Sequence, residues 1–263
     1  MNYIEINKNL WNKKTEIHYE SDFYDVKSFL KGRSSLNPIE LNLLGDVKDK
    51  KILHLQCHFG QDTLSFARMG AKATGVDLSD KAIEKARQLN EAVGMDAIFI
   101  QSDIYQLSEV LDEQFDIVFT SYGTIGWLPD MDRWAQVINH FLKPGGQFLI
   151  VEFHPVVWMF SYDFTKVEYN YLKSDPIVEE EEGTYTNKDA DIKETSVSWN
   201  HGMGEVVNAL IHAGLTIADM HEYDYSPYDC FQNTVQIDDG KYQIKGLEGK
   251  LPLLYSVLAQ KSQ

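Results

Sequence analysis

The sequence contains few cysteines and no long apolar run. Cys57 and Cys230 are its two cysteines, too few for a disulfide framework, which indicates a reducing compartment. The first residues, MNYIEINKNLW, carry neither the basic nor the apolar region of a secretory signal. No stretch approaches the roughly 18 to 20 consecutive apolar residues that span a bilayer. We therefore expect a soluble, cytoplasmic protein with no membrane partner.

Basic residues are also scarce. The 24 Lys and Arg residues are outnumbered by 40 Asp and Glu residues, which gives a formal net charge of −16. So acidic a chain repels phosphate backbones, which argues against a nucleic-acid partner. Most of the carboxylates are expected to keep the surface solvated. A length of 263 residues, 43% of them hydrophobic, predicts one globular domain with an insertion.

Several signatures of enzyme sites are missing. The chain has no GxGxxG dinucleotide fingerprint and no histidine spacing such as HExxH. We therefore expect no metal site. No serine, histidine and acid pattern announces a nucleophilic triad.

The sequence does contain a nucleotide-binding half-site. An apolar strand at 51–57, KILHLQC, leads into a loop that ends at Gly60, and a helical stretch begins at Thr63. Backbone N–H groups at a helix start lack intrahelical partners, so this loop can hold polar ligand atoms. A second strand, AKATGVDLS, places Asp77 at its carboxyl end, where a carboxylate can accept both ribose hydroxyls.

Short apolar runs then alternate with helical periodicity, which is typical of a parallel sheet covered by helices. Helices are predicted at 80–94, 131–142 and 203–215, and strands at 97–103, 115–123, 147–155, 216–225 and 251–261. LKPGG is expected to end the second of these helices and turn the chain into the next strand. The pattern breaks between 156 and 200, which predicts a β-rich insertion, and 228–250 is predicted to be a short hairpin or loop. Within the insertion, Glu179 to Glu182 are interpreted as a solvated turn, with cation binding as the alternative.

The ordered set HLQCHFG, TGVDLS, QSDIYQL, FDIVFTSYGTIGWLPD and LKPGGQFLIVEFHP resembles class I S-adenosylmethionine-dependent methyltransferases, and in particular a bacterial branch whose cofactor loop reads LQCHFG. The resemblance covers essentially the whole chain. It implies an α/β fold with a Rossmann-like seven-stranded sheet of order 3-2-1-4-5-7-6, whose last strand is antiparallel, flanked by helices and with a β-rich insertion after strand 5. The expected parts are an N-terminal helical segment or lid (1–50), a cofactor-binding core (51–155), the insertion as substrate wall (156–200) and the rest of the same sheet domain (201–263).

The cofactor loop departs from the family pattern DLGCGxG. His54 stands in place of the acid, and Gln56 and His58 replace the first two glycines, so that Gly60 alone remains. A neutral imidazole is a poor partner for the methionyl ammonium group, so another carboxylate or backbone carbonyls must share that task. His54 is interpreted either as a buried core histidine or as a ligand contact, whereas the position of His58 favours contact. Cys57 is expected to be a small buried filler rather than a catalytic thiol.

The resemblance carries individual residues over to the cofactor, which is expected to be S-adenosylmethionine. Asp77 would anchor the ribose, Asp103 would accept the adenine amino group, and each could instead be a helix or turn cap. The sulfonium would lie over the end of the fourth strand. The expected cofactor-binding set is Gln56, Cys57, His58, Gly60, Asp77, Leu78, Ser102, Asp103, Ile104, Ser121 and Tyr122.

The chemistry implied is an in-line attack of an acceptor atom on the sulfonium methyl group, in which the protein aligns and desolvates the reactants. Aromatic rings suit a sulfonium, and an arginine suits a carboxylate. The expected substrate-side set is Tyr19, Phe23, Tyr24, Arg33 and Trp127. His154 and His201 are the candidate general bases, with substrate hydrogen bonding or helix capping as the alternative.

The sequence therefore favours an S-adenosylmethionine-dependent methyltransferase acting on a small molecule. Two other classes stay open. A nicotinamide-dependent oxidoreductase could use the same kind of sheet, although the missing GxGxxG disfavours it. A noncatalytic sensor that binds the cofactor is compatible with the altered loop. The acidic composition favours a neutral or cationic acceptor.

Overall fold

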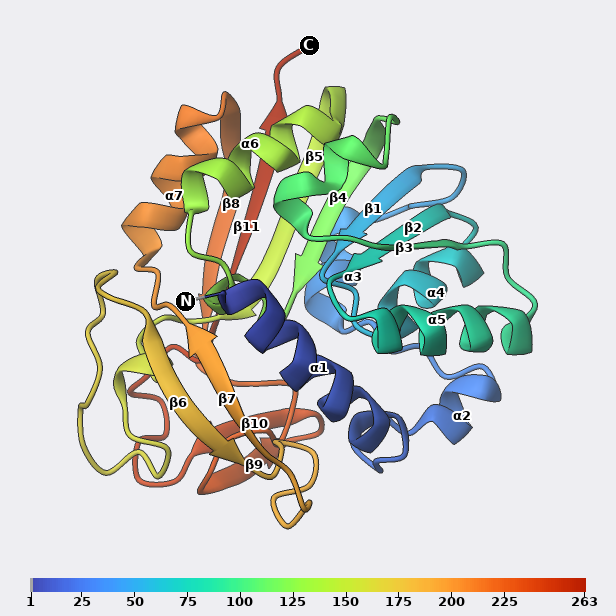
Figure 1. Cartoon of the computed structure of the whole chain (residues 1–263). Coiled ribbons are helices and arrows are strands. Elements are labelled where there is room, and N and C mark those ends of the chain that lie inside the picture. The colour runs from blue at the N-terminus through green and yellow to red at the C-terminus, as the bar shows by residue number, and fades with distance from the viewer. Residues whose placement is uncertain (1) are drawn as a thin grey trace.

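A seven-stranded sheet forms the centre of the protein, seen here in a computed structural model that describes residues 2–263 (Figure 1). The strand order is β3-β2-β1-β4-β5-β11-β8. Strands β1 to β5 run parallel, and β11 is antiparallel to both β5 and β8. The predicted order 3-2-1-4-5-7-6 is confirmed, because β8 and β11 are the sixth and seventh strands of this sheet along the chain. The strands are β1 Lys51–Leu55, β2 Lys72–Asp77, β3 Ile98–Gln101, β4 Phe115–Ser121, β5 Leu142–Phe153, β8 Leu215–Tyr223 and β11 Leu254–Lys261.

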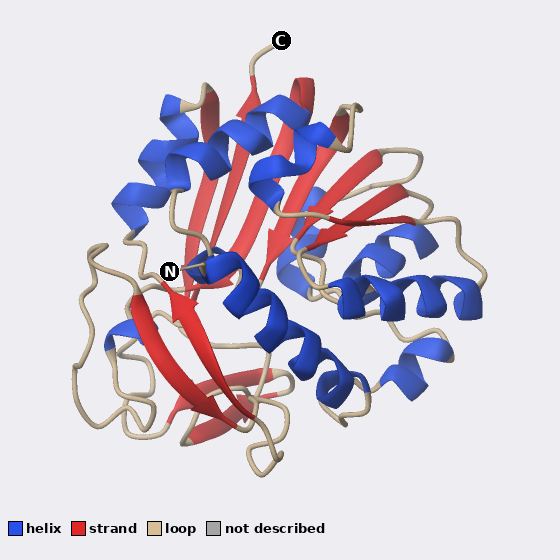
Figure 2. Ribbon diagram, viewed as in Figure 1, coloured by secondary structure: helices blue, strands red, loops and turns tan. Residues whose placement is uncertain are grey.

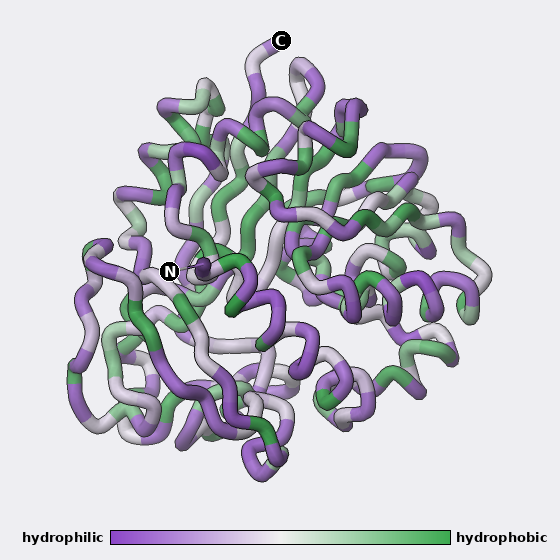
Figure 3. Tube along the Cα trace, viewed as in Figure 1, coloured by the Kyte–Doolittle hydropathy of each residue, from purple (hydrophilic) through white to green (hydrophobic). Residues whose placement is uncertain are grey.

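Helices cover both faces of the sheet (Figure 2). The helices are α3 Pro38–Leu44, α4 Gln61–Arg68, α5 Asp80–Val93, α6 Met131–Phe141 and α7 Met203–His212. Side chains of a strand alternate between faces, so Leu53 packs in the cluster with α6 and α7, whereas its neighbour Ile52 packs in the cluster with α3 and α4. Figure 3 shows hydrophobic residues along the central strands and mainly hydrophilic ones on the outer helix faces.

Several helix and strand boundaries differ from the predictions by a few residues, and two of them bear on the argument. Helix α4 begins at Gln61, not at Thr63, directly after the left-handed Gly60. Strand β5 begins at Leu142, because Leu142 already pairs with Phe115 before the register shifts. LKPGG is therefore part of the strand and not a separate turn.

Two hairpins and an N-terminal helix pack beside the sheet (Figure 1). The elements are α1 Tyr3–Tyr19, α2 Val26–Leu30, β6 Ile177–Glu182, β7 Lys193–Ser198, β9 Thr234–Asp238 and β10 Lys241–Ile244. The β6–β7 hairpin confirms the β-rich insertion after β5, and β9–β10 forms the second hairpin. The turn predicted for 179–182 is wrong, because these four glutamates belong to β6 and pair with β7. Three of them are exposed to solvent, as expected.

Gly60 is a position where the loop cannot accept a side chain. Its φ is +79°, and an added Cβ would lie 2.5 Å from Cε1 of Phe99. We expect Gly60→Ala to lower the free energy of unfolding by about 1–3 kcal/mol more than Gly94→Ala, the size of a small-to-large core clash. Gly94 also has a positive φ, +65°, but open space around it, so its variant reports backbone strain alone. Urea denaturation compares the two, and equal losses would contradict the predicted clash.

Candidate active site

A cavity of about 780 Å³ lies at the carboxyl ends of the parallel strands. Its floor is formed by the segments that follow β1, β2, β3, β4 and β5, and its walls come from α1, the insertion and the loop near Tyr228. The sheet order reverses between β1 and β4. Ligands of open α/β sheets bind at such a switch point, so this cavity is the candidate active site.

The loop after β1 has an unusual backbone. Gln56, His58 and Gly60 all have positive φ, at 55°, 50° and 79°. The Gln56 side chain donates to the carbonyl of Thr124 at 2.8 Å, while its Oε1 is buried without a partner among the described residues. Burial raises the pKa of the Cys57 thiol well above its usual value, so the thiol stays neutral, as expected for a filler.

Asp77 lies at the end of β2 and faces this loop. Its Oδ2 accepts the backbone N–H of His58 at 2.8 Å, and its Oδ1 accepts that of Ser79, also at 2.8 Å. Burial raises the pKa of Asp77 to about 6. A carboxylate offers about four acceptor positions, so two remain for a ligand.

Asp103 lies on the neighbouring strand end and caps a short helix. Its side chain accepts the backbone N–H of Tyr105 at 3.0 Å, at the start of the 3-10 helix η1 Ile104–Glu109. Asp103 and Ile104 line the cavity, but Ser102 does not, because its hydroxyl turns to the carbonyl of Asp103 at 2.8 Å. Asp103 therefore caps η1, as the alternative interpretation predicted, and it also lines the cavity.

Across the cavity, Ser121 ends β4 beside a carboxylate that the sequence reasoning missed. Ser121 Oγ donates to Asp62 Oδ2 at 3.3 Å. Burial raises the pKa of Asp62 to about 6. The sequence signal for this carboxylate is an acid two residues after Gly60. With the helix predicted to begin at Thr63, Asp62 falls in the loop and does not stand out as a helix residue facing the cavity. The Tyr122 hydroxyl donates to the buried Glu40 at 2.9 Å.

The histidines of this region are neutral. His58 Nε2 lies 3.1 Å from Nδ1 of His18, on α1. Burial lowers the pKa of His58 to about 3 and that of His18 to about 2. His54 is buried under the loop, where its Nδ1 lies 2.9 Å from the Thr63 hydroxyl and its pKa falls to about 3. His54 is thus packed as a core histidine at the cavity margin.

Aromatic rings form a wall of the cavity next to His58, which Trp11 and Tyr24 both contact. Trp11 and Trp127 meet edge to face at 5.4 Å between centroids, and the hydroxyls of Tyr24 and Tyr185 are 2.5 Å apart. The buried Lys14 ammonium lies 5.3 and 5.6 Å from the two Trp rings and 2.5 Å from the Glu181 carboxylate. The insertion and α1 are therefore joined by an ion pair inside an aromatic wall.

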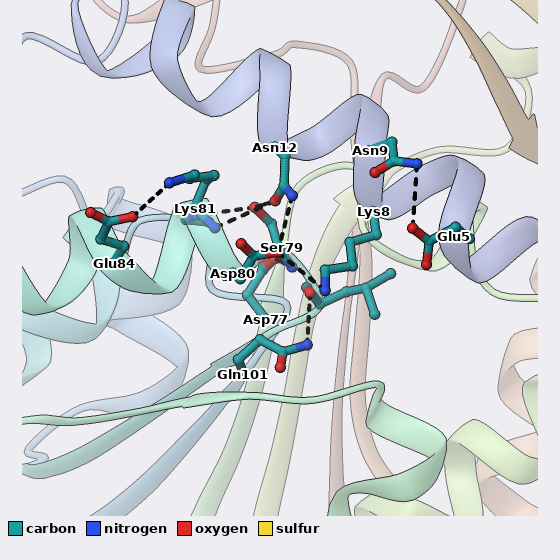
Figure 4. A network of polar contacts seen from close by, with 12 residues as sticks. Glu5, Lys8, Asn9, Asn12, Asp77, Ser79, Asp80, Lys81, Glu84 and Gln101 are labelled. Atoms are coloured by element: carbon teal, nitrogen blue, oxygen red, sulfur yellow. Dashed lines mark hydrogen bonds and ion pairs between the residues drawn. The ribbon is translucent and has the colours of Figure 1, made fainter.

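Helix α1 is also fixed to the loop that follows Asp77 (Figure 4). Asn12 accepts the Ser79 hydroxyl at 2.7 Å and donates to Asp80 at 3.0 Å, and Lys8 pairs with Asp80 at 3.2 Å. These contacts hold α1 across the cavity mouth.

Most residues expected at the site do line this cavity. The exceptions, besides Ser102, are Tyr19, which packs against Phe59, and His154, whose Nε2 lies 2.9 Å from Glu222. His201 lines the cavity, but its Nε2 donates to the carbonyl of Leu128 at 2.8 Å. The residues brought together are Gln56, Cys57, His58, Gly60, Asp77, Leu78, Asp103, Ile104, Ser121, Tyr122, Phe23, Tyr24, Arg33, Trp127 and His201.

The cavity wall is strongly acidic. Within residues 2–263, its basic side chains are Lys14 and Arg33. Its acidic side chains are Asp62, Asp77, Asp103, Glu152, Glu179, Glu180, Glu181 and Glu182. Such a wall favours ligands that carry positive charge. The same part of the chain has no group of three or more His, Cys, Asp or Glu side chains placed to hold a metal ion, and none of its helices has the length and apolar character to cross a membrane.

Comparisons with known proteins show similarity to methyltransferases. Residues 52–146 match the family described as a methyltransferase domain. Ubiquinone biosynthesis O-methyltransferase of Serratia proteamaculans is 28% identical over 130 residues, which cover 48% of this chain and 54% of that protein. The protein of the same name from Pseudomonas aeruginosa is 27% identical over 146 residues, which cover 53% and 62%. The chain thus spans about half the length of the curated relatives it matches.

Solved structures share the fold over nearly the whole chain. An S-adenosylmethionine-dependent methyltransferase from Clostridium acetobutylicum superposes with a TM-score of 0.62 at 16% identity and covers 97% of this chain and 100% of its own. One from Mesorhizobium loti gives 0.60 at 21% identity, with 88% and 100% covered. The protein therefore has the Rossmann-like fold found in these methyltransferases.

Proposed function

We propose that the protein is an S-adenosylmethionine-dependent methyltransferase acting on a small molecule, in the bacterial branch whose cofactor loop reads LQCHFG. The position of Asp77 carries the proposal. Its carboxylate ends β2, lines the cavity and keeps acceptor positions for two ribose hydroxyls. The methyltransferase-domain match spans 52–146, which includes both the loop after β1 and Asp77.

The residues of the cavity fit this cofactor along its length. Asp77 and Leu78 would hold the ribose and one adenine face, and Asp103 and Ile104 would border the adenine edge. The buried, unpartnered Oε1 of Gln56 offers an acceptor at the loop. When bound, the cofactor supplies an electrophilic methyl group on a sulfonium.

The protein's own contribution is alignment and exclusion of water. Helix α1 and the insertion line the cavity, which supports their proposed roles as lid (1–50) and substrate wall (156–200). His154 does not line the cavity, and both of its nitrogens face protein groups. His201 lines the cavity, but its Nε2 donates to the carbonyl of Leu128. We therefore assign neither histidine the role of general base and attribute the rate gain to holding two reactants in line. The acidic wall favours a neutral or cationic acceptor.

Calorimetry tests the proposal directly. We expect S-adenosylmethionine and its product S-adenosylhomocysteine to bind at micromolar to submillimolar concentrations. Transfer of a labelled methyl group into a metabolite extract tests catalysis and would exclude a noncatalytic sensor. No affinity for either compound at millimolar concentration, together with enhanced NADH fluorescence, would favour a nicotinamide-dependent oxidoreductase instead.

Cofactor affinity is expected to fall in acid. Ribose hydroxyls donate to an ionised carboxylate, and the pKa of Asp77 is about 6. Loss of this charge alone should raise the Kd for S-adenosylhomocysteine by about tenfold per pH unit below 6. Asp62 also lines the cavity and has a pKa of about 6, so a contact between its carboxylate and the ligand adds to this slope. The histidines at 18, 54 and 58 have pKa values of about 2 to 3 and stay neutral over this range. For the free protein the sign is opposite, because a raised carboxyl pKa makes the folded state take up its proton first and gain stability as pH falls from 6 toward 4. Calorimetry between pH 5 and 8 measures the first effect, and a flat profile would contradict it.

A further inference from the structure

Within residues 2–263, no cationic group forms an ion pair with the carboxylate of Asp62. It lies in the first turn of α4 and lines the cavity, with the Ser121 hydroxyl 3.3 Å from its Oδ2. Arg33 is the cation that acts on it electrostatically. The guanidinium of Arg33, however, donates to the carbonyl of Tyr24 at 2.6 Å and lies 3.9 Å from the Asp25 carboxylate. A second buried acid, Glu40, adds to the negative potential at Asp62.

The end of β1 carries no acid that could serve in place of Asp62. His54 occupies that strand end, is buried, and points its Nδ1 at the Thr63 hydroxyl, 2.9 Å away. Since its pKa is about 3, the ring is neutral at physiological pH. A neutral imidazole gives a cation no charge partner.

The order of the strands places Asp62 and Asp77 on opposite sides of β1. Asp77 ends β2, and Asp103 follows β3, on one side of β1. Ser121 ends β4 on the other side, and Asp62 contacts it. A ligand whose ribose lies on Asp77 and whose chain crosses the loop after β1 therefore brings its far end to Asp62.

We propose that the Asp62 carboxylate binds the ammonium group of the cofactor's amino-acid tail. This inference depends on the proposed function, since it concerns the same bound molecule. It explains how a loop without the usual acid at its strand end can hold a cationic amine: the carboxylate has moved from the strand to the first turn of the following helix. An ammonium donating to a carboxylate is a charge-assisted hydrogen bond, one of the stronger polar contacts in proteins.

A thermodynamic cycle tests the assignment. The two ligands are S-adenosylhomocysteine and its analogue with hydrogen in place of the ammonium group, and the two proteins are wild type and Asp62→Asn. In the wild type we expect the ammonium to improve the Kd by about 10- to 100-fold, the range for hydrogen bonds to charged groups. In Asp62→Asn this ratio should fall to within about threefold of one, because the partner of the ammonium has lost its charge.

Glu40→Gln is the matched control, since Glu40 is a buried acid near Asp62 that does not line the cavity. Its ratio should stay within about threefold of that of the wild type, because Glu40 acts on Asp62 only at a distance. Asp62→Ser is measured in parallel, so that the result does not depend on the folding of one variant. If the wild type prefers the ammonium ligand and both Asp62 variants keep that preference, the inference is wrong and the proposed function stands. If the wild type binds neither ligand, both are wrong, and a wild type that binds the two ligands equally rejects the inference alone.

Discussion

Asp77→Asn is expected to weaken S-adenosylhomocysteine binding by at least about 100-fold. Each oxygen of Asp77 accepts a backbone N–H, from His58 and from Ser79. The side-chain NH₂ of an asparagine must face one of these N–H groups or a ribose hydroxyl. Because an NH₂ cannot accept, one of these donors is left without an acceptor, at a cost of about 1–3 kcal/mol. The charge that strengthens both ribose contacts is lost as well. Calorimetry on the purified variant measures the change in Kd.

Asp80→Asn is the matched control for this prediction. Asp80 lies three residues further along the same segment but points to α1, where Lys8 and Asn12 contact it (Figure 4). Its variant should bind S-adenosylhomocysteine within about threefold of wild type, because an exposed ion pair contributes roughly 0–1 kcal/mol. Equal losses in both variants would show that the docking of α1, and not the carboxylate of Asp77, controls affinity.

The central strands were predictable because they are buried on both faces. Runs such as FDIVFTS and QFLIVEF contain few polar residues, and helices separate the first strands, which together indicate parallel neighbours. The start of β5 was not predictable, because Pro144 and Gly145 normally interrupt a strand. There the register shift between Phe115 and Ile117 accommodates them.

The candidate site was predictable where it follows the strands and unpredictable where distant segments supply it. Asp77 and Asp103 end predicted strands, and both line the cavity. In sequence, at least 113 residues separate Trp11 and Lys14 from Trp127 and Glu181. These four side chains nevertheless meet at one wall of the cavity. Helical periodicity says which face of α1 is buried but not against which segment it packs. The four glutamates of β6 were predicted as a turn because an acidic run is typical of a solvated loop. They do remain largely exposed, but they pair with β7 in a hairpin that local sequence does not indicate.

Glu152 holds the loop that forms the cavity floor after β4, and its loss should be costly. This buried carboxylate, near the end of β5, accepts the backbone N–H groups of Gly123, Thr124 and Ile125, together with its neighbour Phe153 and the Thr124 hydroxyl. Glu152→Ala leaves these donors without an acceptor. At about 1–3 kcal/mol for each buried unsatisfied group, partly relieved by entering water, we expect a total loss of about 3–5 kcal/mol in the free energy of unfolding.

Urea denaturation measures this loss, and Glu222→Ala is the control. Glu222 lies at the same end of the sheet but is exposed, and within residues 2–263 its one ion-pair partner is His154. Its variant should therefore change the free energy of unfolding by no more than about 1 kcal/mol. Hydrogen exchange adds a local readout, because the amides of Thr124 and Ile125 should exchange faster in Glu152→Ala before the sheet does. Slow exchange at both amides in a variant of normal stability would mean that the loop keeps its shape without Glu152. In that case the backbone of the floor, and not the carboxylate beneath it, would fix the place of Ser121 and Tyr122 beside the ligand.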